Sequence, residues 1–97
     1  MEFLVLTSRY VRQGERERVI MQAVIEAAEA IGVDRIVMRR GNVYSTGVYV
    51  DDGSEKALLY NDWDRNWDRK KIYDSIMASV RSSPSLRQKR QLILTLS

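Results

Sequence analysis

The sequence predicts an α+β fold, in which an antiparallel sheet carries two helices on one face, with the element order β-α-β-β-β-α-β. Two observations carry this prediction. Two segments repeat their apolar residues with a helical period, and short segments rich in Val, Ile, Leu and Tyr lie before, between and after them. The order is a variant of the ferredoxin-like βαββαβ plan with one extra strand. A chain of 97 residues fits one domain, residues 1–97.

The chain opens with an expected strand over residues 2–11. Phe3, Val5 and Thr7 point to one face, whereas Leu4 and Leu6 point to the other. Apolar groups on both faces indicate a central strand.

Residues 15–31 are expected to form an amphipathic helix. Its apolar side chains recur at the spacing i, i+1, i+4, i+5 and form one stripe: Val19, Ile20, Ala23, Val24, Ala27, Ala28 and Ile31. Glu15 and Glu17 would favour the positive end of the helix dipole in the first turn. Gly32 is placed to end the helix in a left-handed conformation.

A three-stranded antiparallel meander is expected next, over residues 34–40, 43–50 and 56–60. The pair Gly41-Asn42 is typical of a two-residue hairpin turn, and the sequence DDGSE supplies the second turn.

The second helix is expected between residues 67 and 82, capped at its start by Asn66 or Asp68. Pro84 marks its end, because the residue before a proline disfavours helical angles. Alternating apolar residues in the tail QLILTLS, residues 91–97, predict a last strand.

Composition excludes several kinds of chemistry. The chain has no cysteine and no histidine, which removes disulfides, imidazole bases and ordinary zinc sites. Phosphate-binding glycine loops and helix-turn-helix signatures are also absent from the sequence. We therefore expect no catalytic residues, no metal and no cofactor. Without a signal peptide or a long apolar segment, a cytoplasmic location is the default expectation.

Arginine dominates the cations. Arginine outnumbers lysine twelve to four, and the formal net charge is +3. Arginine suits phosphates and aromatic faces, although an arginine-rich surface is also typical of heat-adapted hosts. The candidates for a phosphate-binding patch are Arg39, Arg40, Arg87, Lys89 and Arg90.

Both tryptophans lie in the charged stretch NDWDRNWDRKK, residues 61–71. Trp63 and Trp67, flanked by Arg65 and Arg69, could stack nucleic-acid bases. The alternative is that Trp63 folds under its loop and closes the open end of the core. Asp62, Asp64 and Asp68 are expected to serve as helix caps, because the run lacks the glycine and glutamate of a calcium loop.

Strand spacing adds a third aromatic candidate, Tyr44. Arg35, Val37 and Arg39 share one face of their strand, and Tyr44, Thr46 and Val48 share one face of the next. If both faces are the uncovered side of the sheet, arginine and tyrosine mix there, as in RNA-binding sheet platforms.

The first hypothesis is a small non-enzymatic protein that binds DNA or RNA. We expect it to be a homodimer, because an exposed sheet face on a chain of this size is commonly buried by self-association. The alternative is a protein-interaction or assembly module that forms a homo-oligomer through its open sheet face and its tryptophan-containing loop. A divalent-metal nuclease built on Asp62, Asp64 and Asp68 is a third hypothesis.

Overall fold

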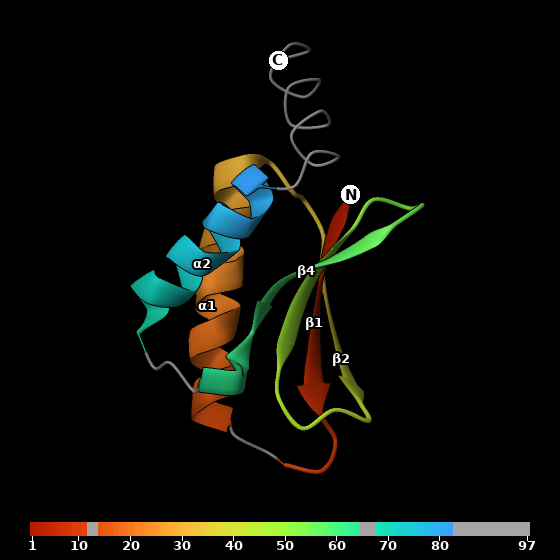
Figure 1. Ribbon diagram of the computed structural model, residues 1–97, viewed down its shortest axis with the longest axis vertical. Helices are drawn as coiled ribbons and strands as arrows, with labels where there is room; N and C mark the ends of the chain where they lie inside the picture. The colour runs from red at the N-terminus through yellow and green to blue at the C-terminus, as the bar shows by residue number, and fades with distance from the viewer. Residues whose placement is uncertain (12–13, 65–67, 83–97) are drawn as a thin grey trace.

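The computed structural model describes residues 1–11, 14–64 and 68–82 of the chain. The elements follow one another as β1 (Glu2–Ser8), α1 (Gly14–Ile31), β2 (Ile36–Gly41), β3 (Gly47–Asp51), β4 (Lys56–Asn61), the 3-10 turn η1 (Asp62–Asp64) and α2 (Arg69–Ser82). Both helices lie on one face of the sheet, as Figure 1 shows. The predicted α+β class with two helices on one face is confirmed.

The sheet has the strand order β2-β1-β3-β4 and is mixed, so the prediction of a wholly antiparallel sheet is wrong. β1 pairs in parallel with β2 and antiparallel with β3, and β3 pairs antiparallel with β4. The expected hairpin at Gly41-Asn42 is wrong, because β1 lies between β2 and β3 and pairs with both. The expected strand over residues 43–50 occupies Gly47–Asp51 instead.

The predicted ferredoxin-like order is therefore not the order of this sheet. β2 enters through the helical crossover of α1, which carries the chain back to the start of the sheet and makes β1 and β2 parallel. Pairing of β1 with both neighbours then leaves β2 at one edge. The predicted last strand, residues 91–97, lies outside the described residues.

The end of α1 and the start of α2 follow local capping rules. At the carboxyl end Gly32 adopts a φ of 77°, and the Val33 amide donates to the Ala28 carbonyl over 2.9 Å. This is the hydrogen-bond pattern of a Schellman cap, so the predicted role of Gly32 is confirmed. α2 begins after Asp68, whose carboxylate accepts a hydrogen bond from the Lys70 amide over 2.9 Å, so Asp68 caps this helix as predicted.

The core lies between the sheet and the two helices. Phe3 and Val5 from β1 are fully buried there beside Val48 and Val50 from β3. The helices contribute their apolar stripes, including Ile20, Val24, Ile72 and Ile76, all 0–1% exposed. Ala27 and Ala28 are also buried, and their small side chains let α1 lie close to its neighbours. The predicted alternation of β1 is found, and the structure shows that the face of Phe3, Val5 and Thr7 is the one turned to the helices.

The other face of the sheet carries an apolar row that no described element covers. Leu4 has Val37 and Tyr49 as its direct cross-strand neighbours, and Tyr49 has Leu58 as its neighbour on β4. The row Val37, Leu4, Tyr49 and Leu58 thus crosses all four strands, and Leu58 is 51% exposed. Among the described residues, neither helix is long and apolar enough to cross a membrane.

Candidate functional site

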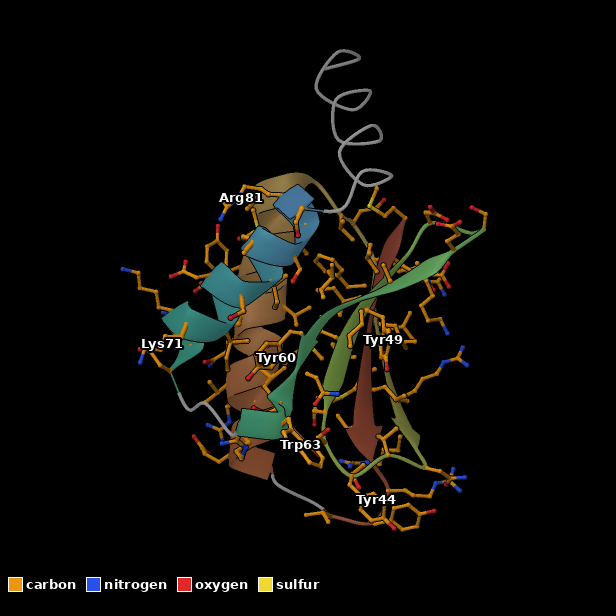
Figure 2. All side chains as sticks on the ribbon, in the orientation of Figure 1. Tyr44, Tyr49, Tyr60, Trp63, Lys71 and Arg81 are labelled. Atoms are coloured by element: carbon orange, nitrogen blue, oxygen red, sulfur yellow. The ribbon has the colours of Figure 1, made fainter. Side chains whose placement is uncertain are left out.

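Three exposed aromatic rings gather where β1 ends. Tyr10 is 56% exposed, whereas Tyr44 and Trp63 are each 76% exposed. The rings of Tyr10 and Tyr44 are stacked, with centroids 5.3 Å apart. Figure 2 shows Trp63 and Tyr44 at the same end of the molecule, next to the carboxyl end of β1. The alternative prediction that Trp63 closes the core from beneath its loop is wrong, because its ring faces solvent.

Ser8 shapes the chain where it leaves the sheet. Its Oγ accepts hydrogen bonds from the amides of Tyr10 and Val11, both over 3.0 Å. This serine turn is a local device that bends the backbone after a strand. Without this turn the chain would continue in the direction of β1, beyond the end of the sheet. The turn brings Tyr10 back to the ring of Tyr44.

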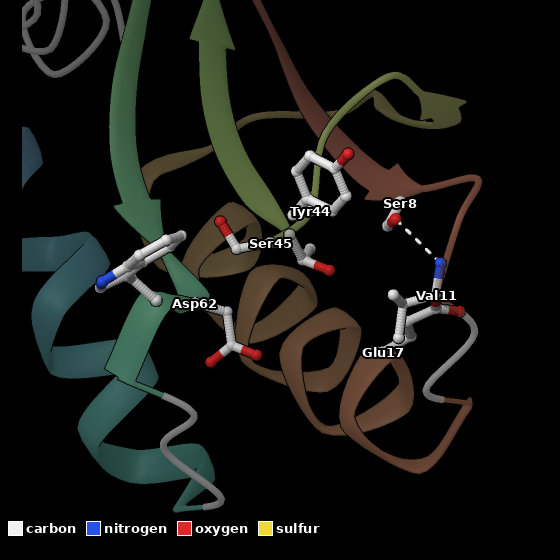
Figure 3. A pocket seen from close by; sticks show the side chains of 8 residues that line it. Ser8, Val11, Glu17, Tyr44, Ser45 and Asp62 are labelled. Atoms are coloured by element: carbon white, nitrogen blue, oxygen red, sulfur yellow. Dashed lines mark hydrogen bonds between the residues drawn. The ribbon is translucent and has the colours of Figure 1, made fainter.

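A pocket of about 260 Å³ opens beside these rings. Its walls combine two exposed aromatic rings with hydroxyl and carboxylate groups. The lining residues are Ser8, Val11, Glu17, Tyr44, Ser45, Thr46, Asp62 and Trp63. Figure 3 shows Tyr44, Ser45 and Asp62 on one side and Ser8, Val11 and Glu17 on the other. The pocket is therefore assembled from β1, α1, η1 and the loop between β2 and β3.

A buried ion pair fixes the turn that carries Trp63. The Arg16 guanidinium donates from Nε to Asp62 Oδ2 over 2.8 Å and contacts the same oxygen through Nη2. The two side chains are 4% and 5% exposed. Asp62 Oδ1 accepts a further bond from the Tyr60 hydroxyl over 2.8 Å. Because Asp62 opens η1, these bonds place the neighbouring Trp63.

A second ion pair ties α1 to the other edge of the sheet. Arg40 donates from Nη1 and Nη2 to the two carboxylate oxygens of Glu17, over 3.2 and 3.1 Å. Its Nη1 also donates to the Ser8 carbonyl over 3.1 Å. Arg16 and Glu17 are neighbours on α1, so one turn of helix is held to the end of β2 and to η1 together. The pocket walls are positioned by this clamp.

Further cations lie outside the pocket at the same end of the sheet. Arg39 is exposed, with Leu6 as its neighbour on β1, so its side chain shares the open face with the apolar row. Arg9 is exposed, and its amide donates to the Gly41 carbonyl over 3.0 Å. Arg40 is engaged with Glu17, and its side chain is 39% exposed. Exposed arginines therefore lie along the rim, whereas the carboxylates that line the pocket are paired with Arg16 and Arg40.

Four of the predicted site residues meet at this end of the sheet: Arg39, Arg40, Tyr44 and Trp63. Arg69 does not line the pocket, since it lies on α2 and pairs with Glu26 of α1 over 3.3 Å. The other predicted residues lie outside the described part of the chain: Arg65, Trp67, Arg87, Lys89 and Arg90.

The expected mixing of arginine and tyrosine on one sheet face is only partly found. Val37 and Arg39 lie on the open face, but Val48 is fully buried on the helix side. Tyr44 belongs to the loop before β3, which begins at Gly47. It reaches the site from the end of the sheet and not from its surface.

Sequence reasoning missed Arg9, Tyr10 and the buried side of the first turn of α1. Glu17 was expected to act on the helix dipole, yet it is 8% exposed and holds Arg40. A signal was present in the helical phase, because positions 16 and 17 precede Ile20 by four and three residues and so continue its stripe.

The aspartates of the tryptophan segment have structural partners where their side chains are described. Asp62 is bonded to Arg16 and Tyr60, and Asp68 caps α2. Within residues 1–11, 14–64 and 68–82, no group of three or more acidic side chains is arranged to hold a metal ion.

No family model matches the chain, and neither a curated protein nor a solved structure is detectably similar to it.

Proposed function

We propose that the chain is a small cytoplasmic, non-enzymatic protein that binds single-stranded nucleic acid at the end of its sheet. The observation that carries this proposal is the gathering of three exposed aromatic rings, Tyr10, Tyr44 and Trp63, beside the exposed cations Arg9 and Arg39. Stacking of bases on aromatic rings, with cations along the backbone, holds single strands without reading their sequence.

The exposure of Trp63 supports the proposal on energetic grounds. An indole left 76% exposed contributes little to the core, although burial would stabilise the fold by roughly 2 kcal/mol or more. The clamp of Arg16 and Asp62 nevertheless holds the turn that presents the ring. A ring held at the surface by buried charges is suited to contact a ligand.

The arginines divide into two roles in this proposal. Arg9 and Arg39 are exposed and would contact phosphates. Arg40 already forms two bonds with Glu17, so its role is to hold the end of β2 against α1. In the proposal, the arginines that contact phosphate are thus distinct from the arginine that supports the site.

The proposal is tested by fluorescence anisotropy with labelled single-stranded DNA and RNA, starting at about 50 mM salt, where non-specific binding is strong. Trp63→Ala should weaken binding by about 1–3 kcal/mol. Arg39→Gln should lower the magnitude of the slope of log K against log salt by about 0.7, the effect of one lost phosphate contact. Arg35→Gln is the matched control, because Arg35 is exposed at the opposite end of β2 and pairs with Glu2.

Two results would contradict the proposal. One is the absence of binding to any single strand at about 50 mM salt. The other is equal weakening by Arg39→Gln and Arg35→Gln, which would show that net charge matters and the end of the sheet does not.

The apolar row of the open face favours a second candidate, an assembly module that forms a homodimer. Val37, Leu4, Tyr49 and Leu58 form a continuous strip across the sheet, and a second copy of the chain could bury it by a two-fold stacking of the two sheets. Sedimentation velocity of the full chain should then show a dimer that Leu58→Lys dissociates. Ile25→Lys is the control, because Ile25 is a similarly exposed residue, 42%, on α1. A wild-type chain that sediments as a monomer at high protein concentration would exclude this candidate.

A further inference from the structure

We infer that the pocket between Tyr44 and Trp63 receives one unstacked base of the bound strand and prefers a base with an exocyclic amino group, cytosine in the first place. The inference rests on the proposed function and adds a chemical preference to it. Its basis is the lining of the pocket, whose described residues offer hydrogen-bond acceptors and no cation, together with the exposed guanidinium groups of Arg9 and Arg39 on the rim.

The volume of the pocket is sufficient for one base and too small for a whole nucleotide. At about 260 Å³ it lies below the roughly 300–1,000 Å³ of sites that take drug-sized ligands. A base fits this space, whereas a whole nucleotide would leave its sugar and phosphate outside. The exposed rings of Tyr44 and Trp63 supply the flat apolar surfaces on which a base stacks.

The lining of the pocket disfavours phosphate as its occupant. Glu17 and Asp62 are the charged side chains that line it, and both are acidic. Each is already paired with an arginine, Asp62 with Arg16 and Glu17 with Arg40, so a phosphate placed here would lose water and gain no cation from the described lining residues. The exposed Arg9 and Arg39 offer the backbone a favourable place on the rim.

The polar groups of the pocket select the edge of the base. A carboxylate accepts hydrogen bonds and does not donate them. The Ser45 hydroxyl donates to Asn61 Oδ1 over 2.8 Å, so its remaining capacity toward a ligand is also that of an acceptor. The acceptors of Glu17, Asp62 and Ser45 match an amino group, as when an acidic side chain accepts from cytosine N4. Uracil places a carbonyl oxygen at the same position and would face these acceptors with another acceptor.

The ion pairs of Arg16 with Asp62 and of Arg40 with Glu17 hold the two pocket carboxylates in fixed positions. Arg16 holds Asp62, and Arg40 holds Glu17 with two bonds, so neither carboxylate is free to turn away from an unsuitable base. Acceptors that cannot move discriminate between ligands. A ligand that places its own acceptor opposite them leaves both groups without a hydrogen bond, which costs binding free energy.

The experiment compares a single-stranded oligonucleotide of eight deoxyuridines with the same strand carrying one deoxycytidine. The two probes differ at one base and have the same length and charge. We expect the deoxycytidine strand to bind the wild-type full chain at least about fivefold more tightly. Ser45→Leu fills the pocket and removes one acceptor, so it should bring the two affinities together while binding of the deoxyuridine strand changes less. Leu58→Ala, on the open face, is the control and should keep the preference.

The outcomes separate the two levels of the proposal. Equal affinity of both strands for the wild-type chain would overturn the base preference and leave single-strand binding intact. Binding of neither strand would overturn the preference together with the proposed function. A preference that survives in a folded Ser45→Leu variant would show that the selectivity arises elsewhere. The wild-type comparison alone decides the inference if Ser45→Leu does not fold.

Discussion

The buried pair of Arg16 and Asp62 gives a sharp prediction about stability. Replacing Arg16 by Met keeps a long apolar stem but removes the guanidinium, and it leaves the Asp62 carboxylate, 5% exposed, without its cation. Removing one partner of a buried pair costs about 3–5 kcal/mol, because a buried charge is left uncompensated. A domain of this size has a free energy of unfolding of about 5–15 kcal/mol. The substitution should therefore remove a large share of the stability.

Arg18→Met is the matched control on the same helix. Arg18 pairs with Glu15 over 3.3 Å, but the side chains are 68% and 63% exposed. Exposed pairs are screened by water and contribute little. Arg18→Met should change the free energy of unfolding by less than about 0.5 kcal/mol.

Urea unfolding followed by far-ultraviolet circular dichroism measures both variants. With an m-value of about 1–2 kcal/mol/M, Arg16→Met should lower the urea midpoint by at least about 1.5 M. The double variant Arg16→Met with Asp62→Leu should recover most of the loss, because neither charge of this pair remains. If Arg16→Met and Arg18→Met lower the midpoint equally, the clamp does not hold η1 and the account of the site fails.

Three further predictions use the same assay. Gly32→Ala should cost about 1–2 kcal/mol, because φ is 77° there, whereas Gly14→Ala, at a position without steric contacts, should cost nothing measurable. Ser79→Ala should cost about 1 kcal/mol by removing the 2.7 Å bond to a carbonyl of β4, and Ser75→Ala, exposed on the same helix, should be neutral. Trp63→Ala should leave the free energy of unfolding within about 0.5 kcal/mol, since its ring is exposed; a larger loss would indicate that the ring stabilises the core.

The part of the candidate site that could be predicted from the sequence consists of residues whose chemical type is unusual for their segment. Trp63, Tyr44 and Arg39 stood out as aromatic or cationic groups in polar segments, and the structure brings them to one end of the sheet. Tyr10 was hidden inside an expected strand, because the alternation of β1 gave no reason to end it at Ser8. The serine turn that ends it depends on one side-chain oxygen and two amides.

The sequence by itself determined the helices, their caps and the alternation of side chains along β1, because these follow from spacings within a few residues of the chain. Which face of β1 lies under the helices was decided by the tertiary structure, since both faces carry apolar side chains. The sequence could not determine the strand order. The Gly41-Asn42 turn signal concerns neighbouring residues only. The hydrogen bonds of β1 with β2 and with β3 instead join residues about 30 to 50 positions apart, and these pairings set the strand order. The clamp is of the same kind, linking Arg16 to Asp62 across 46 positions and Glu17 to Arg40 across 23. Such contacts exist only after the layers have packed, and so the tertiary structure alone decided where the pocket and its charges lie.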